Sequence, residues 1–221
     1  MKKRYLLVVF DWEGTLGDTL GHVFNTLAAE AARLDLGVID ESLARHYGML
    51  GLAKAINKLF PGLSLHQHEQ LLHAVQEEMS TTSPDACLFP GARQCVEDLS
   101  HAGVVLAIAT NKGPHSLQRV LHASGLNDYF SVTRAAGPVP PKPCPQMIEE
   151  IMAVCGVSPS ETLMIGDSVA DIEMATRARV DAIGIDFYHQ HPMQLLEAGA
   201  LAVFEDYTQL ARYLKRSDEQ E

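Results

Sequence analysis

Acidic side chains recur in two short segments of the sequence, FDWEGTL and GDSVAD. The first places Asp11 and Glu13 two residues apart, and the second places Asp167 and Asp171 four residues apart. A carboxylate can attack an electrophile and so divide a difficult hydrolysis into two easier steps through a covalent intermediate. Carboxylates are also the ligands that an octahedral, oxygen-preferring ion such as Mg²⁺ takes. These residue types therefore suit metal-assisted displacement at phosphorus.

Hydrogen-bond donors and a positive charge lie in two further segments. Thr110 and Asn111 end an apolar run, and Lys112, which follows them, is expected to line the mouth of the same site. Lys142 lies in a PPKP segment, whose prolines restrict the backbone and hold the lysine in one direction. A hydroxyl, an amide and an ammonium supply the donors that stabilise a phosphoryl group in the transition state. The sequence has no GxxxxGK[ST] motif, so a nucleotide-binding P-loop is not expected.

Short apolar runs precede three of these motifs and recur through the second half of the chain. They stay apolar at consecutive positions, and most carry Val or Ile, as strands buried on both faces do. The runs are 5–10, 104–109, 162–165, 182–185 and 201–204. Helical patterns separate them at 92–101, 115–123, 145–155, 170–178 and 207–214. The alternation predicts right-handed crossovers and a parallel sheet that helices cover on both faces.

The carboxyl ends of parallel strands lie along one edge of a sheet, where α/β proteins bind ligands. Asp11, Thr110, Asn111 and Asp167 all lie at the ends of predicted strands, so we expect them to meet in one crevice. Each motif alone has a common structural explanation: a turn for DxxG, a helix cap for Gly-Asp, and an exposed side chain for Lys142. Four motifs in one order, three of them at strand ends, favour a functional site.

The segment 17–86 breaks the alternation of strands and helices. Its helical patterns have no convincing strand between them and are Asp18–Leu34, Glu41–Tyr47, Leu52–Phe60 and His66–Met79. A polar TTSP stretch then reads as a linker. The predicted fold is therefore α/β, a Rossmann-like parallel sheet core that an inserted small α-helical cap domain interrupts. We assign residues 1–16 and 87–221 to the core and residues 17–86 to the cap.

The chain is acidic but otherwise has the composition of a folded globular protein. Its 221 residues carry a formal net charge of -11 at pH 7. This charge argues against nucleic acid and against an anionic membrane as partners, and it favours a bound cation. No apolar run approaches membrane-spanning length, and the short run after MKKR ends in acidic residues and does not read as a signal peptide. We expect a cytoplasmic protein.

The cysteines support the same compartment. They form no CxxC pair and have no nearby histidine at zinc-site spacing, so we expect them to be unpaired in a reducing environment. The four are Cys87, Cys95, Cys144 and Cys155.

The four motifs resemble the signatures of the haloacid dehalogenase (HAD) superfamily of hydrolases. They match in residue type and in order: the aspartate of FDWEGTL, the Thr-Asn at a strand end, the lysine of PPKP, and GDSVAD. The chain length and the helical segment after the first motif are similar to the phosphoglycolate phosphatase-like branch. The resemblance covers about residues 5–214.

The resemblance implies a metal and a nucleophile. Asp11 would attack phosphorus and form an aspartyl-phosphate. A Mg²⁺ ion would be held by the carboxylates of Asp11 and Asp167 and by the backbone carbonyl of Glu13. The substrate would be a small phosphorylated metabolite.

The resemblance also implies how the phosphoryl group is held. Thr110 and Asn111 would bind it, and Lys142 would offset its charge and that of the nucleophile. Asp171 would support the metal or the lysine from behind. The helical insert would be a mobile cap that closes over substrate and expels water.

Position 13 departs from the family. It is normally Asp in the family's phosphatases and acts there as general acid and base, whereas here it is Glu13. Ligation by the backbone carbonyl is indifferent to this change. Proton transfer is not, because a methylene moves the carboxyl by about 1.5 Å, and a misplacement of about 1 Å can cost ~10²-fold in rate. The loop can also adjust, since both carboxyls have similar acidity. We hypothesise that Glu13 impairs hydrolysis of substrates with poor leaving groups most.

Other functions remain open on the same scaffold. One alternative is a catalytically weakened HAD-fold binding or regulatory protein, and another is a different HAD reaction such as phosphosugar mutation, dehalogenation or phosphonate cleavage. The resemblance implies that the last two usually lack a carboxylate at position 13, whereas mutases usually keep Asp there. The motifs leave the physiological substrate and the oligomeric state open.

Several further polar residues have a simpler interpretation as surface residues. The two His-Gln-His segments, 66–68 and 189–191, have no third ligand at a sensible spacing, so we interpret them as surface histidines. Trp12 is expected to pack in the core. Five basic residues of the predicted cap are interpreted as solvated helix residues and not as substrate contacts: His22, Arg33, Arg45, Lys54 and Lys58.

Overall fold

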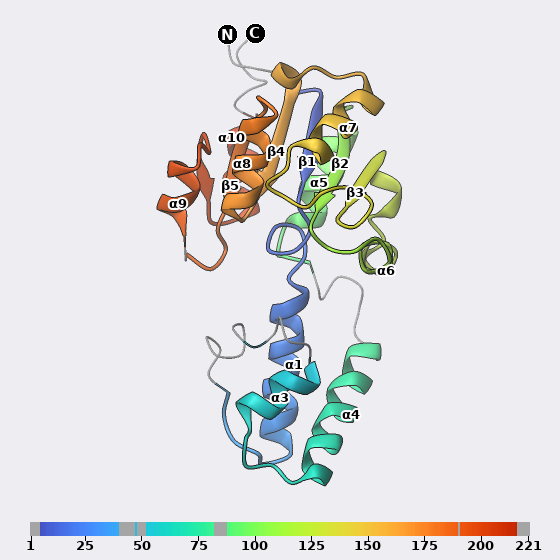
Figure 1. Cartoon of the computed structure of the whole chain (residues 1–221), viewed down its shortest axis with the longest axis vertical. Helices are drawn as coiled ribbons and strands as arrows, with labels where there is room; N and C mark the ends of the chain where they lie inside the picture. The colour runs from blue at the N-terminus through green and yellow to red at the C-terminus, as the bar shows by residue number, and fades with distance from the viewer. Residues whose placement is uncertain (1–4, 40–46, 48–51, 82–87, 190, 216–221) are drawn as a thin grey trace. The chain divides into compact units, whose positions relative to one another are not determined.

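The computed structural model describes residues 5–39, 47, 52–81, 88–189 and 191–215 (Figure 1). The chain divides into two compact units. One comprises residues 1–17 and 88–221, and the other residues 18–87. The predicted helix Glu41–Tyr47 lies outside the described residues except for Tyr47, and Cys87 lies outside them as well.

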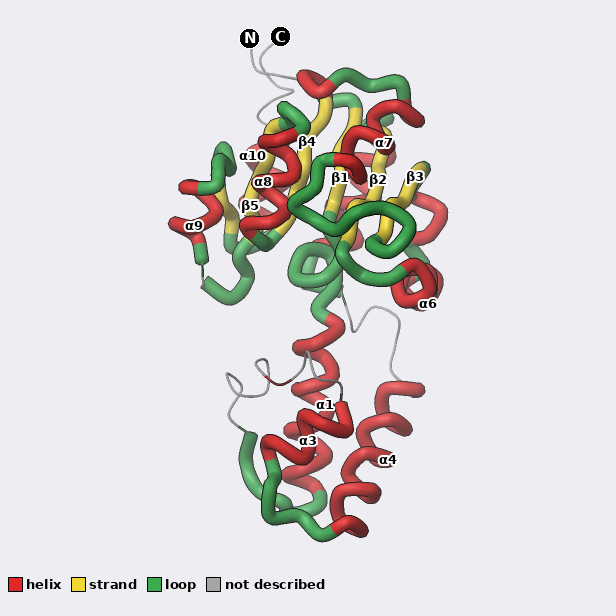
Figure 2. Tube along the Cα trace, viewed as in Figure 1, coloured by secondary structure: helices red, strands yellow, loops and turns green. Residues whose placement is uncertain are grey.

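A parallel sheet forms the centre of the first unit (Figure 2). Its strand order, among the described residues, is β3-β2-β1-β4-β5-β6, and every pairing is parallel. The strands are β1 (Leu7–Phe10), β2 (Val105–Thr110), β3 (Val132–Ala135), β4 (Thr162–Gly166), β5 (Asp181–Ile185) and β6 (Val203–Phe204). The predicted α/β fold with a Rossmann-like parallel sheet is confirmed.

Helices cover both faces of this sheet because the side chains of β1 alternate between two apolar clusters. Val8 and Phe10 belong to the cluster that includes residues of α5 (Ala92–His101), α6 (Pro114–Ser124) and α10 (Tyr207–Lys215). Leu7 and Val9 belong to the cluster that includes residues of α7 (Gln146–Cys155), α8 (Val169–Arg177) and α9 (Pro192–Glu197). Trp12 is buried in the first cluster, as expected.

The structure adds elements that the sequence patterns did not predict. β3 is an edge strand in which Val132 is buried and Thr133 is exposed, so it produces no consecutive apolar run. α9 is only six residues long and begins at a proline. The described residues of this unit also include two short 3-10 helices, η2 (Asn127–Tyr129) and η3 (Pro159–Glu161).

Three helices of the second unit pack around an apolar cluster of their own. They are α1 (Thr19–Arg33), α3 (Leu52–Leu59) and α4 (Leu65–Thr81). Asp18 caps α1, because its carboxylate accepts a hydrogen bond of 2.8 Å from the backbone N–H of Gly21. The cluster comprises Phe24, Leu27, Ala31, Ala55, Ile56, Leu71 and Val75.

The basic residues of this unit are mostly exposed. Arg33, Lys54 and Lys58 are exposed and His22 is partly buried, whereas Arg45 lies outside the described residues. None of the helices that the structure describes combines the length and the apolar character needed to cross a membrane.

Candidate active site

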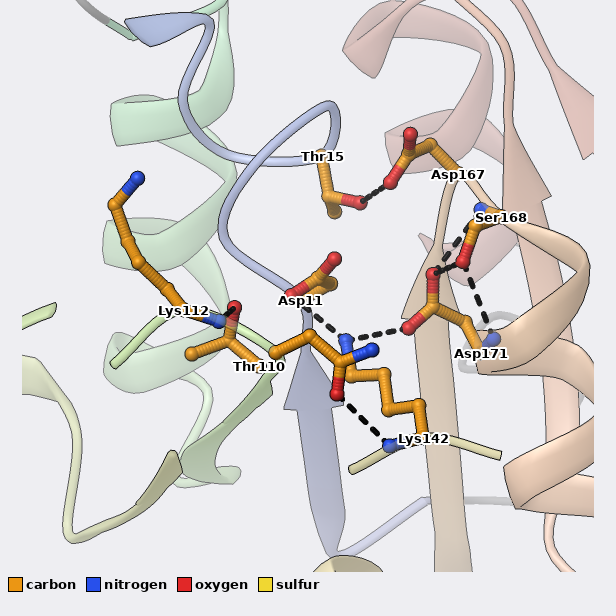
Figure 3. Close-up of polar contacts among 9 residues, drawn as sticks. Asp11, Thr15, Thr110, Lys112, Lys142, Asp167, Ser168 and Asp171 are labelled. Carbon is orange, nitrogen blue, oxygen red and sulfur yellow. Dashed lines mark hydrogen bonds and ion pairs between the residues drawn. The ribbon is translucent and has the colours of Figure 1, made fainter. Parts of the chain in front are cut away.

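The carboxyl ends of three neighbouring strands bring the predicted site residues together (Figure 3). Asp11 directly follows β1, Thr110 ends β2, and Asp167 directly follows β4. Because β1 pairs with β2 on one side and with β4 on the other, these side chains emerge at one edge of the sheet. Asp11 and Thr110 are buried, at 8% and 1% relative exposure.

Lys142 is the positive centre of the site. Its Nζ lies 2.7 Å from Asp11 Oδ1 and 2.6 Å from Asp171 Oδ1. Its backbone N–H donates a hydrogen bond of 2.8 Å to Asn111 Oδ1, which fastens the proline-rich segment to the end of β2. Burial alone lowers the pKa of Lys142, but the charges of Asp11 and Asp171 outweigh it and raise this pKa above its ordinary value. The lysine therefore stays charged beside the nucleophile candidate.

Asp171 is fixed by a capping box at the start of α8. Asp171 Oδ2 accepts two hydrogen bonds from Ser168, one from the backbone N–H (3.0 Å) and one from the side-chain hydroxyl (2.6 Å). In return, Ser168 Oγ accepts a hydrogen bond from the Asp171 N–H (3.3 Å). A side chain at Gly166 would collide with Asp171, so this close approach to β4 requires glycine. The cap leaves Asp171 Oδ1 directed at Lys142. Ser168 was not among the residues predicted from the sequence, although the S-x-x-D spacing is a capping signature.

Asp167 packs against the loop that follows β1. Its Oδ1 accepts a hydrogen bond of 3.1 Å from Thr15 Oγ1, and Thr15 is fully buried. Gly14 has a φ of 80°, and a Cβ at this position would collide with the Asp167 carboxylate. The Tyr207 hydroxyl donates to the Thr15 carbonyl at 2.9 Å and holds the loop from the other side. The role of Thr15 could not be predicted from the sequence, because its contact with Asp167 joins residues 152 positions apart.

The charge balance of the site fits a divalent cation. Carboxylate oxygens of Asp11, Asp167 and Asp171 lie within 4.8 Å of one another. Burial raises the pKa of Asp11 to about 6 against the opposing charge of Lys142. Burial and the neighbouring carboxylates raise the pKa of Asp167 to about 8. The single ammonium of Lys142 does not compensate the negative charge of the three carboxylates. Carboxylate oxygens are also ligands that suit Mg²⁺. Asp171 already accepts hydrogen bonds through both oxygens, so Asp11 and Asp167 are the better direct ligands.

Glu13 lies beside a residue of the neighbouring loop. Its Oε2 is 2.9 Å from Lys112 Nζ. Its backbone forms an isolated bridge with Gly17, and the Gly14 N–H donates to the Gly17 carbonyl at 2.8 Å. The loop that carries Glu13 is therefore tightly turned. Lys112 was predicted to lie near the site, but its ion pair with Glu13 was not predicted.

Other groups do not join this cluster. His189 Nδ1 lies 3.2 Å from Glu205 Oε1, and His66 is exposed. A groove of about 590 Å³ is lined chiefly by residues of α6 and β3, and none of the predicted site residues lines it. The candidate active site is therefore recognised by the charged side chains that converge in it, and not by this groove. Cys95, Cys144 and Cys155 form no disulfide within the part of the chain that the structure describes.

Comparison with known proteins identifies the family. The family model of haloacid dehalogenase-like hydrolases matches residues 5–179. The chain belongs to this family. This HAD protein is 27% identical over 220 residues to the phosphoglycolate phosphatase of Mesorhizobium japonicum (strain LMG 29417 / CECT 9101 / MAFF 303099), across 96% of this chain and 97% of the relative. The prediction of an enzyme of the HAD phosphatase type, a phosphoric monoester hydrolase, is confirmed.

Solved structures support the fold. A predicted phosphoglycolate phosphatase from Haemophilus somnus 129PT superposes with a TM-score of 0.67 at 21% identity, over 95% of this chain and 97% of that one. CbbY of Rhodobacter sphaeroides, solved with xylulose-(1,5)-bisphosphate, superposes with a TM-score of 0.62 at 21% identity, over 93% of this chain and 96% of that one.

Proposed function

We propose that this HAD protein is a Mg²⁺-dependent phosphatase of small phosphorylated metabolites that acts through an aspartyl-phosphate on Asp11. The observation that carries the proposal is the buried pair of Asp11 and Lys142, 2.7 Å apart at the end of β1. A buried carboxylate beside a fixed ammonium is placed to attack an anionic phosphoryl group, because the lysine offsets charge on both.

The reaction proceeds in two displacements. Asp11 attacks phosphorus and forms a P–O bond as the bond to the leaving oxygen breaks, and Glu13 gives that oxygen a proton. Glu13 then takes a proton from water, which attacks the aspartyl-phosphate and releases inorganic phosphate and free Asp11. The carboxylates of Asp11 and Asp167 and the Glu13 carbonyl would hold Mg²⁺, which would neutralise part of the charge of the phosphoryl group.

The other site residues hold the phosphoryl group and the lysine. Thr110 and Asn111 bind phosphoryl oxygens, and Lys142 neutralises part of their charge. Asp171 acts on the lysine from behind, at 2.6 Å. Its own position is set by the cap of α8, so it does not need to reach the substrate.

The substrate and the helical unit form a further part of the proposal. The relative from Mesorhizobium japonicum, similar over nearly its whole length, is a phosphoglycolate phosphatase, which supports a small phosphate ester as substrate. We assign residues 1–16 and 87–221 to the catalytic core and residues 17–86 to a cap that excludes water. The net charge of -11 disfavours nucleic acid and anionic membranes as partners.

Phosphate release across a panel of phosphorylated metabolites tests the proposal. The wild type with Mg²⁺ should release phosphate from at least one ester, and chelator should abolish turnover. Asp11→Asn should abolish both turnover and the aspartyl-phosphate that single-turnover quenching traps in the wild type. A wild type that binds phosphate esters without forming this intermediate would be a binding or regulatory protein. Equal turnover in chelator would remove the metal from the mechanism.

A further inference from the structure

A lysine–glutamate pair joins the loop after β1, which carries the proposed nucleophile, to the segment that directly follows β2 and its proposed phosphate-binding threonine. Lys112 Nζ lies 2.9 Å from Glu13 Oε2, and the two side chains are 17% and 29% exposed. Ion pairs shielded to this degree lose less to salt and water than pairs on an open surface. The partners are 99 positions apart in the chain, so only the fold brings them together.

Both ends of the pair have an anchored backbone. The Lys112 N–H donates to Thr110 Oγ1 at 3.3 Å, directly after β2 and before α6 begins at Pro114. Glu13 lies in the turned loop after β1, in which the Gly14 N–H donates to the Gly17 carbonyl. The Lys112 ammonium and the Glu13 carboxylate are therefore both carried by backbone segments that hydrogen bonds hold in place.

A glutamate at this position needs such a restraint more than an aspartate does. Its side chain has one more rotatable bond, so its carboxyl samples more positions, and ordering it costs side-chain entropy. An ion pair with an anchored ammonium removes part of that freedom. A carboxylate has two oxygens with several acceptor sites, so an ion pair through Oε2 does not by itself prevent proton transfer.

We infer that Lys112 is a positioning residue for Glu13, which holds the longer carboxyl where it can exchange a proton with the leaving oxygen. The inference rests on the proposed function, because that function gives Glu13 its acid–base role. Lys112 acts through Glu13 and not on the phosphoryl group. Its loss should therefore affect the chemical step and leave substrate binding intact.

Steady-state kinetics of Lys112→Met test this role on two kinds of substrate. On alkyl phosphates, whose leaving oxygen needs a proton, kcat should fall about 10-fold or more while KM stays within about 2-fold. On p-nitrophenyl phosphate, whose leaving group needs far less protonation, kcat should change less than about 2-fold. Lys112→Arg keeps the charge and should recover most of the lost rate.

A double-mutant cycle separates action through Glu13 from action on substrate. In a Glu13→Gln background the carboxylate is gone, so Lys112→Met should lower kcat by no more than about a further 2-fold. Arg119→Met is the matched control, because Arg119 is an exposed cation on α6; its kinetics should match the wild type. A KM rise in both backgrounds, an equal loss on both substrates, or unchanged kinetics would each overturn the inference.

Crystal structures provide a test that does not depend on turnover. In the wild type the Glu13 carboxylate should occupy one rotamer against Lys112, and in Lys112→Met it should spread over several. One shared rotamer in both would contradict the positioning role. The two proposals fail differently: a wild type that forms no aspartyl-phosphate contradicts the proposed function, whereas turnover insensitive to Lys112→Met contradicts only this inference.

Discussion

Asp11, Lys142 and Asp171 are charged residues of the site that lie buried, and Lys142 is the clearest case. Lys142 is enclosed by two carboxylates, each within 2.7 Å of its Nζ. A buried ion pair contributes little net stability compared with an apolar replacement, but removal of one partner leaves the other charge uncompensated. In the proposed mechanism this arrangement serves the chemistry, because the ammonium is already desolvated and oriented before a phosphoryl group arrives.

Substitution of Lys142 should expose this dependence. Lys142→Met removes the buried ammonium and leaves the carboxylates of Asp11 and Asp171 uncompensated, so it should lower the free energy of unfolding by ~3 kcal/mol. Urea unfolding measures this loss. Glu173→Gln, which breaks an exposed pair with Arg177, is the control and should cost less than about 1 kcal/mol. Similar losses in both variants would contradict the special status of the buried pair.

The residue at position 13 should govern which leaving groups are tolerated. Glu13→Asp shortens the side chain to the family's usual length and should raise kcat on alkyl phosphates about 10-fold or more, with little change on aryl or acyl phosphates. The comparison of kcat on both kinds of ester checks this. An equal change on the two, or no change, would rule out an impaired acid.

At the scale of elements, loops and helix ends position the carboxylates. The loop after β1 approaches Asp167 closely enough that Gly14 must lack a side chain, and its φ of 80° favours glycine as well. On the opposite side the cap of α8 fixes Asp171. The distances within the site thus depend on backbone geometry as much as on the acidic residues themselves.

Gly14→Ala should disturb this geometry. The added methyl group strains the loop and displaces Asp167, so we expect a stability loss of about 1–3 kcal/mol and weaker Mg²⁺ binding by calorimetry. Gly62→Ala is the control, because its Cβ would meet nothing within 4 Å; it should leave Mg²⁺ binding unchanged. Wild-type affinity in Gly14→Ala would show that Asp167 does not bind the ion from this position.

At the scale of the whole molecule, the site costs stability when no cation is bound. The pKa of Asp167 is raised to about 8 and that of Asp11 to about 6, against ordinary values near 4. Between about pH 4 and pH 8 the folded protein therefore binds more protons than the unfolded chain. Because unfolding releases those protons, stability falls as pH rises from about 4 to 8, and the full cost is present above about 8.

Mg²⁺ should therefore stabilise the protein more at pH 8 than at pH 5. At ~100 times its Kd, an ion that binds only the folded state adds about 2.7 kcal/mol, which corresponds to a rise in Tm of ~5–10 °C for a chain of this size. Thermal unfolding with Mg²⁺ or chelator at the two pH values measures it. Asp167→Asn should remove most of the Mg²⁺ effect, and an effect independent of pH would contradict the raised pKa values.

The residue pattern was enough to predict the parallel α/β core and the residues that converge at one edge of its sheet. Consecutive apolar runs specify buried strands, and because parallel strands share a carboxyl edge, the residues after β1, β2 and β4 had to converge. The short elements β3 and α9 escaped prediction because edge strands and single helical turns carry little periodic signal.

The contacts between individual side chains could not be predicted from the sequence and are seen first in the folded structure. The contacts of Lys142 with Asp171, of Thr15 with Asp167 and of Lys112 with Glu13 join residues 29, 152 and 99 positions apart. Periodicity describes the face on which a residue lies, whereas a hydrogen bond or an ion pair depends on distances of a few tenths of an ångström between separate loops. Those distances arise from packing, and no local pattern encodes them.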